Sequence, residues 1–173
     1  MGGITVKQVA YQKQLILYLQ NNCNEQAYDF AKQYVNEYPE DMVAHFLLAK
    51  SAIASENFGE ATIEARRAYN LAKNEADMIM CVIHACVAYY KLGEYTKGFE
   101  LLKATEHIRS CEETEQLFFL FSLSVNDDKE AEKHFTNMFA INNIAAKEFV
   151  ETIAEGVDLD FEKLFKNTDR ITY

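Results

Sequence analysis

The chain has 173 residues, of which 49% are hydrophobic and 25% charged, and 17 Lys and Arg against 27 Asp and Glu leave a formal net charge of -10. Six glycines and one proline argue against disorder and against a loop-rich β sandwich. The length suffices for one domain, or one short array of repeats, with a buried core. An acidic chain without a basic stripe is a poor candidate for nucleic-acid binding.

The start of the chain and its cysteines favour a cytoplasmic protein. No basic cluster precedes an apolar run, so we expect no secretory signal, and no stretch reaches the roughly 18 apolar residues of a membrane span. The four cysteines, Cys23, Cys81, Cys86 and Cys111, are scattered through helical sequence. This distribution is expected of free thiols in a reducing compartment.

Helical periodicity runs through almost the whole chain and predicts an all-α fold. The segments between turn signals are about 12–15 residues long, which is ordinary for helices joined by short loops. Apolar faces recur, in chain order, at Tyr11, Leu15, Tyr18 and Leu19; at Tyr28, Ala31, Tyr34 and Val35; at Phe46, Leu47, Ala49 and Ile53; and at Phe118, Phe119 and Leu123.

Capping residues predict where several helices begin. In a capping box, a side-chain oxygen accepts a backbone N–H that the first helical turn leaves unpaired. The pairs with this spacing are Asn57 with Glu60, Ser110 with Glu113, and Asp127 with Glu130. In addition, Pro39-Glu40-Asp41 is expected to end one helix and cap the next.

Small residues recur after the predicted turns at a nearly constant interval. Ala27, Ala61, Gly98 and Ala131 are separated by 34, 37 and 33 residues. The middle interval carries three extra residues near 70–77, so we expect the last helix of the second pair to run long. Two antiparallel helices cannot bury their apolar faces alone, and a small residue lets the next pair approach closely.

This pattern resembles the tetratricopeptide repeat family. Residues 92–95, Leu-Gly-Glu-Tyr, match the family's turn signature, Tyr18 and Tyr89 match its first-helix aromatic, and Pro39 matches its repeat-ending proline. The chain departs from the family in having no Trp, only one repeat-ending proline, and Gly98 where alanine is usual.

The resemblance implies a right-handed superhelical stack of antiparallel helix pairs, a solenoid. Four hairpins would occupy residues 1–141, and one or two capping or groove-filling helices would follow in 142–173. In that tail, Ile144 to Ile153 would form one helix ending at Gly156, and Asp158 would cap a shorter one. The alternative architecture is a plain helical bundle.

The resemblance also implies a binding face, because the first helix of each pair lines a concave groove in this family. By register, the groove side presents Val9, Gln12, Ile16 and Leu19; Val43, Phe46, Lys50 and Ile53; Met80, Ile83, Val87 and Tyr90; and Glu113, Gln116, Leu120 and Leu123. We expect partner contacts from Ile16, Leu19, Phe46, Lys50, Ile53, Met80, Ile83, Val87 and Tyr90. The Lys, Asn and Arg residues with which some members hold acidic chaperone peptides are replaced here by Gln12, Ile16, Leu47, Met80 and His84.

The segment 78–90 carries no charged residue, and a helix that is hydrophobic all round must be covered all round. It is either core, or it is covered by an amphipathic helix or peptide of another protein, by a second copy, or by the tail 142–173. We therefore expect a non-catalytic protein–protein interaction module, an adaptor or chaperone-like protein. The alternative is a self-associating scaffold or complex subunit.

Signatures of catalysis are missing. The chain has no glycine-rich phosphate loop and no Gly-x-Ser-x-Gly motif. His107 with Cys111, and Cys81 with His84, have spacings that offer two ligands to a metal, but a structural zinc site needs four. We expect no cofactor and no metal; an enzyme or metal protein built on His107 and Cys111 is the least favoured hypothesis.

Overall fold

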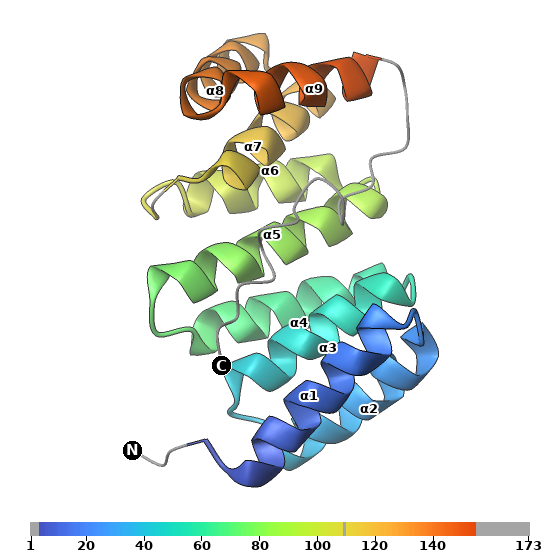
Figure 1. The fold of residues 1–173 in the computed structure, drawn as a ribbon. Helices are drawn as coiled ribbons and strands as arrows, with labels where there is room; N and C mark the ends of the chain where they lie inside the picture. Colours follow the sequence, from blue (N-terminus) through green and yellow to red (C-terminus); the bar gives the residue numbers. More distant parts are fainter. Residues whose placement is uncertain (1–3, 109, 155–173) are drawn as a thin grey trace. The chain divides into compact units, whose positions relative to one another are not determined.

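The computed structural model describes residues 4–108 and 110–154, and these are all-α, with helices packed in neighbouring pairs and no strand (Figure 1). The chain divides into two compact units, an N-terminal unit, Met1–Gly93, and a C-terminal unit, Glu94–Tyr173. None of the helices in these ranges combines the length and apolar character that a membrane span requires.

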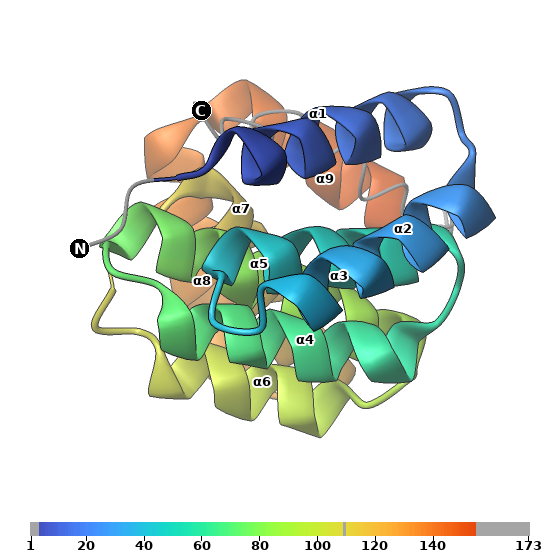
Figure 2. The same ribbon diagram turned by 90° about the horizontal axis from the view of Figure 1, so that it is seen from below.

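The N-terminal unit contains α1 (Val6–Gln20), α2 (Asn24–Glu37), α3 (Met42–Ala54), α4 (Phe58–Leu71) and α5 (Glu75–Lys91). Each helix packs against the next one along the chain, and α3 also contacts both α1 and α5 (Figure 2). The first helices of successive pairs therefore touch one another directly.

The C-terminal unit contains α6 (Tyr95–Ala104), α7 (Glu112–Ser124), α8 (Asp128–Ile141) and α9 (Asn143–Ala154). Again each helix packs against the next. The helix α9 corresponds to the first helix predicted in the tail, and it buries Ala146 and Phe149. The second predicted tail helix, after Asp158, lies outside the described residues.

One backbone turn recurs at the ends of α1, α3, α5 and α7. In each case a residue with left-handed φ follows the helix, namely Asn22 (φ 55°), Glu56 (59°), Gly93 (71°) and Asn126 (59°). Each of these residues lies five positions before one of the four small residues found in the sequence. The intervals of 34, 37 and 33 residues therefore separate structurally equivalent turns.

The hydrogen bonds of this turn are those of a Schellman motif. The residue after the left-handed one donates its N–H to a carbonyl five positions earlier, which satisfies an acceptor that the helix end leaves unpaired. The bonds join Cys23 to Tyr18 (2.9 Å), Asn57 to Ala52 (2.7 Å) and Asp127 to Ser122 (2.9 Å).

The three extra residues lie in α5 and not, as expected, in the helix before it. The helix α4 has 14 residues, as α2 and α8 have, whereas α5 has 17 and α3 and α7 have 13. The added turn is at the start of α5, where the Asn74 side chain accepts a hydrogen bond from the Asp77 N–H at 3.0 Å.

The small residues are buried at the helix contacts. Ala61 forms a cluster with Ala52 and Ala88, against which Tyr28 and Phe58 pack.

In the C-terminal unit, Gly98 meets the ring of Phe121, and a Cβ atom at position 98 would overlap that ring. The glycine that departs from the repeat pattern is thus explained by an aromatic side chain of α7.

Two of the predicted caps are formed and two differ. Asp41 accepts from the Val43 N–H (2.9 Å), and Asp127 accepts from the Glu130 N–H (3.2 Å). Asn57 is the N-cap of α4 but makes no side-chain cap hydrogen bond. The N-cap of α7 is Cys111 and not Ser110.

Candidate functional site

The sixteen predicted groove positions fall into four rows, defined by their distance from the left-handed residue of their turn. The row 13 positions before it is half-buried: Val9, Val43, Met80 and Glu113. The row 10 positions before it is buried: Gln12, Phe46, Ile83 and Gln116. The row 6 positions before it contains Ile16, Lys50, Val87 and Leu120. The row 3 positions before it contains Leu19, Ile53, Tyr90 and Leu123.

The nine residues predicted to contact a partner divide between interior and surface. Phe46, Ile83 and Val87 are buried, with 2% of Ile83 exposed. The other six are half-buried: Ile16, Leu19, Lys50, Ile53, Met80 and Tyr90. The buried members on α3 and α5 are therefore core, and the half-buried members, which are apolar except for Lys50, remain partly at the surface.

Contacts between α3 and α5 hold these two helices together beneath that surface. The rings of Phe46 and His84 meet edge to face, with 4.7 Å between centroids at 72°. The His84 Nδ1 lies 2.8 Å from the Met80 carbonyl oxygen, one helical turn away. The His84 ring that meets Phe46 is thereby held against its own helix.

The uncharged segment of α5 is mostly covered. Residues 81–83 and 85–89 are buried, and residues 78–80, His84 and Tyr90 are half-buried. Burial raises the pKa of the Cys81 thiol to about 12 and also raises the pKa of the Cys86 thiol. Both thiols are therefore protonated and unreactive at neutral pH.

A buried ion pair joins α3 to α4. His45 Nδ1 lies 2.5 Å from Glu64 Oε2, and His45 Nε2 lies 2.8 Å from the Pro39 carbonyl oxygen. The Glu64 carboxylate, the Pro39 carbonyl and the attraction of Glu64 raise the pKa of His45 against the opposing effect of burial. Arg67 donates to Glu64 Oε1 at 2.6 Å.

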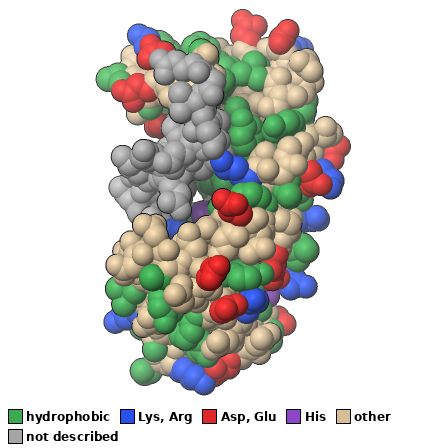
Figure 3. Space-filling view, turned by 90° about the vertical axis from the view of Figure 1, so that its right-hand side faces the viewer, with side chains coloured by type: hydrophobic (Ala, Val, Ile, Leu, Met, Phe, Trp, Pro, Cys, Tyr) green, Lys and Arg blue, Asp and Glu red, His purple; other side chains and the backbone are tan. Residues whose placement is uncertain are grey.

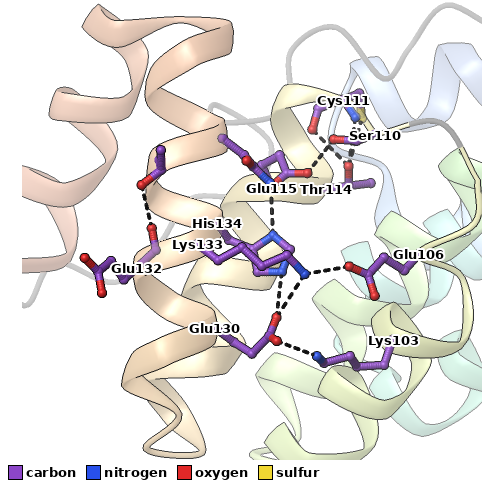
Figure 4. Close-up of polar contacts among 12 residues, drawn as sticks. Lys103, Glu106, Ser110, Cys111, Thr114, Glu115, Glu130, Glu132, Lys133 and His134 are labelled. Carbon is purple, nitrogen blue, oxygen red and sulfur yellow. Dashed lines mark hydrogen bonds and ion pairs between the residues drawn. The ribbon is translucent and has the colours of Figure 1, made fainter.

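A related buried pair joins α7 to α8 in the C-terminal unit (Figure 4). His134 Nδ1 lies 2.7 Å from Glu115 Oε2, and the His134 ring stacks on Phe118 with 4.0 Å between centroids. Ser110 and Asn137 also donate to the Glu115 carboxylate, at 2.5 Å and 3.1 Å. Burial alone would raise the pKa of Glu115, but these three donors outweigh it and lower the pKa.

An ion-pair network surrounds this second pair. Lys103 of α6 lies 2.9 Å from Glu130 of α8, while Lys133 lies 2.7 Å from Glu106 and 3.3 Å from Glu130. These contacts tie α6 to α8. Sequence reasoning missed the contacts of Lys103 with Glu130 and of Glu106 with Lys133, because these partners lie 27 residues apart in the chain, on α6 or the turn after it and on α8.

Neither histidine pair has the arrangement of a catalytic triad. In such a triad the nucleophile bonds to the histidine and the carboxylate orients the other ring nitrogen. Here Ser110 bonds to Glu115, and His134 is 2% exposed beneath a phenyl ring. The Glu115 carboxylate accepts from three donors and His134 has no access to a substrate, so this pair serves to hold α7 to α8.

A polar cluster at the start of the chain fixes α1 to α2 and α3. Tyr34 donates to Asp41 at 2.6 Å and accepts from Gln12 at 3.0 Å, and Gln8 donates to the same Asp41 oxygen at 2.8 Å. The rings of Tyr11 and Tyr34 stack with 4.8 Å between centroids. Gln12 is thus a packing residue and not part of an open groove.

The histidine and cysteine pairs considered as metal ligands do not extend into larger sets. Within 4–108 and 110–154, no three His, Cys, Asp or Glu side chains are grouped to hold a metal ion. His107 is exposed and Cys111 half-buried, whereas Cys81 is buried.

The outer surface mixes charged and apolar groups. Acidic and basic side chains lie among hydrophobic ones on the face seen in Figure 3. Ile63 of α4 is 53% exposed, and an exposed apolar set lies where α8 meets α9: Phe139, Ile141 and Ile144.

No family model matches the chain, and a search of curated proteins found no similar sequence. The function is therefore inferred from the residues and contacts described above.

Proposed function

We propose that this chain is a non-catalytic protein-interaction module of the tetratricopeptide type, a cytoplasmic adaptor whose helix pairs form a right-handed solenoid. In this proposal, α1, α3 and α5 bind an amphipathic helix or peptide of another protein. The observation that carries it is the common register of partly exposed apolar side chains on these three helices.

The geometry of the N-terminal unit supports such a surface. Because α3 touches both α1 and α5, half-buried residues at one register position lie on adjacent helices. Val9, Val43 and Met80 form one row, and Leu19, Ile53 and Tyr90 form the other, ten residues along each helix, or about 15 Å.

The size of the surface suits a short helix. Adjacent helix axes are about 8–10 Å apart, so a partner crossing α1, α3 and α5 would span roughly 20 Å, or three to four helical turns. Met80 adds an unbranched, polarizable side chain that adapts to differently shaped apolar partners.

The absence of free catalytic groups at this surface supports a binding role. The buried acidic and histidine side chains of both units are held in ion pairs and hydrogen bonds. Apart from the ammonium group of Lys50, the surface contributes aliphatic, aromatic and thioether groups, which bind by burial of apolar area.

The structure indicates which substitutions test the proposal without unfolding the chain. Ile83 and Val87 are core residues, so acidic side chains there would disrupt folding. Ile53 and Met80 are half-buried, and Ile53→Glu with Met80→Glu should abolish partner capture from native lysate. The matched control is Ile63→Glu on α4, which should capture as the unmodified protein does.

Circular dichroism and thermal melting must show that all three proteins are folded. Capture that survives in the folded double variant would refute the proposed face. Capture lost equally in the Ile63→Glu control would show that the substitutions act through general surface charge.

A second candidate function is self-association as a scaffold or complex subunit. It is favoured by the exposed apolar residues Phe139, Ile141 and Ile144 where α8 meets α9, because contiguous apolar surface marks interaction sites. Sedimentation equilibrium distinguishes the two functions. A dimer that Ile144→Lys dissociates supports self-association, and a monomer over the whole concentration range excludes it.

A further inference from the structure

A cavity of about 480 Å³ opens in the N-terminal unit between the ends of α2 and α4 and the turn that precedes α3. It is lined by Val35, Asn36, Pro39, Glu40, His45, Arg67, Asn70 and Leu71. This volume falls within the range of pockets that take small molecules. The cavity is separate from the face on α1, α3 and α5, so the inference does not depend on the proposed function.

The hydrogen bonds of His45 define the charge at the cavity wall. One ring nitrogen faces a carboxylate oxygen of Glu64 and the other faces the Pro39 carbonyl oxygen. A carbonyl oxygen only accepts, and the Glu64 carboxylate also accepts from Arg67. Both ring nitrogens therefore face oxygen atoms, and the bond to Glu64 raises the pKa of His45, which favours the imidazolium cation.

Charges of both signs lie at this wall. Glu64 faces His45 and Arg67, and Glu40 adds a second carboxylate to the lining. His45 is buried, whereas 59% of the Arg67 side chain is exposed. Its guanidinium has five N–H donors, and the bond that fixes it is the one from Nη1 to Glu64. The Arg67 guanidinium is therefore the positive group that a ligand in the cavity can reach.

The other lining residues indicate which kind of ligand would fit the cavity. Val35, Pro39 and Leu71 are the apolar residues of the lining, and Asn36 and Asn70 line the same cavity. Glu40 is the acidic residue of the lining, and its negative charge weakens anion binding.

We propose that this cavity binds a small carboxylic acid with an apolar body, with Arg67 as the anion-binding residue. A guanidinium presents parallel N–H groups that match the two oxygens of a carboxylate. The apolar body would lie against Val35, Pro39 and Leu71.

Titration with 4-methylpentanoate, followed by NMR of ¹⁵N-labelled protein, tests the site. The side-chain amide signals of Asn36 and Asn70 are local reporters, and the neutral 4-methylpentanamide is the matched control ligand. We expect saturable shifts with the acid in the millimolar range, which is ordinary for a ligand of this size, and shifts at least about tenfold weaker with the amide.

Three exposed substitutions separate specific binding from general charge effects. Arg67→Gln should weaken binding of the acid by about tenfold, while the adjacent Arg66→Gln should leave it unchanged. Glu40→Gln should strengthen it by a few fold, because a like charge is removed. Equal shifts with acid and amide, or binding that persists in Arg67→Gln or falls equally in Arg66→Gln, would overturn the proposal.

Discussion

His45 and Glu64 form a buried pair, 19 residues apart and 2.5 Å from ring nitrogen to carboxylate oxygen, and the C-terminal unit contains the same pair in reverse order. His45 and Glu115 each lie 11 positions before a left-handed residue, and Glu64 and His134 each lie 8 positions after one. The residues at these two positions thus contact each other in both units, whether the histidine lies on the first helix of the pair, as His45 does, or on the second, as His134 does.

The first helix pair shows the same contact without charge. The equivalent residues there are Tyr11 and Phe30, whose ring centroids lie 4.9 Å apart. In these three helix pairs the contact is therefore set by position in the repeated backbone, and its chemistry differs from one pair to the next.

Removing the charge of Glu64 should destabilise the chain far more than removing its exposed partner. Glu64→Gln leaves the His45 cation buried without a counter-charge, so we expect a loss of about 3 kcal/mol in the free energy of unfolding. Arg67 is largely exposed, and Arg67→Gln should cost less than about 1 kcal/mol. Urea unfolding measures both, and equal losses would contradict the account of the pair.

The two pairs should respond to pH in opposite directions. Bonding to Glu64 raises the pKa of His45 above 6.5, so its contribution is fully present below about pH 6.5 and is lost as the pH rises through the raised value. Its donors lower the pKa of Glu115 below 4.5 despite burial, so its contribution is lost as the pH falls through that lowered value.

Comparing each variant with the unmodified protein at several pH values checks this expectation. The unmodified protein and His45→Gln should differ less in free energy of unfolding as the pH increases. The unmodified protein and Glu115→Gln should differ less as the pH decreases. If the His45→Gln difference stayed constant or grew with increasing pH, or the Glu115→Gln difference stayed constant or grew with decreasing pH, the pairs would not titrate as described.

Replacing two helical glycines by alanine should have opposite effects on stability. Gly98→Ala places a methyl group against the Phe121 ring, and we expect a loss of about 1–3 kcal/mol. No atom lies within 4 Å of a Cβ atom built at Gly59, so Gly59→Ala should stabilise by about 0.5–1 kcal/mol. Thermal melting measures both, with Gly98→Ala/Phe121→Leu as the rescue. Stabilisation by Gly98→Ala would refute the contact.

The repeated turn predicts a further pair of opposite effects. Glu56 holds a left-handed φ of 59°, which costs a residue with a side chain about 1 kcal/mol, so Glu56→Gly should stabilise. Gly93→Ala, at φ 71°, should destabilise by a similar amount. If both substitutions changed stability in the same direction, the shared turn conformation would not control the effect.

The sequence predicted the helical class and the repeat intervals because both depend on local chemistry. Small residues after the turns mark equivalent positions, and Asp41 and Asp127 cap helices through bonds to near neighbours. The Thr5 cap of α1, with Gln8 three residues on, has the same local signature, and a search for Thr-x-x-Gln would have found it.

Other features depend on packing between helices, and the sequence alone could not settle them. Extra residues near 70–77 lengthen the interval equally whether they extend α4 or α5, so spacing alone could not place them. The burial of Ile83 and Val87, and the pairing of His45 with Glu64, depend on which helices meet, and Gly98 is explained only by the ring of Phe121.

Site-specific photo-crosslinking tests the proposed binding face most directly. A photoreactive phenylalanine analogue at Val43, Ile53 or Met80 should give a discrete adduct, and mass spectrometry should identify its partner peptide as an amphipathic helix of another protein. The same group at Ile63 of α4 should give none. Adducts formed equally at Ile63, or adducts at the three face positions made only with the chain's own residues, would contradict the proposal.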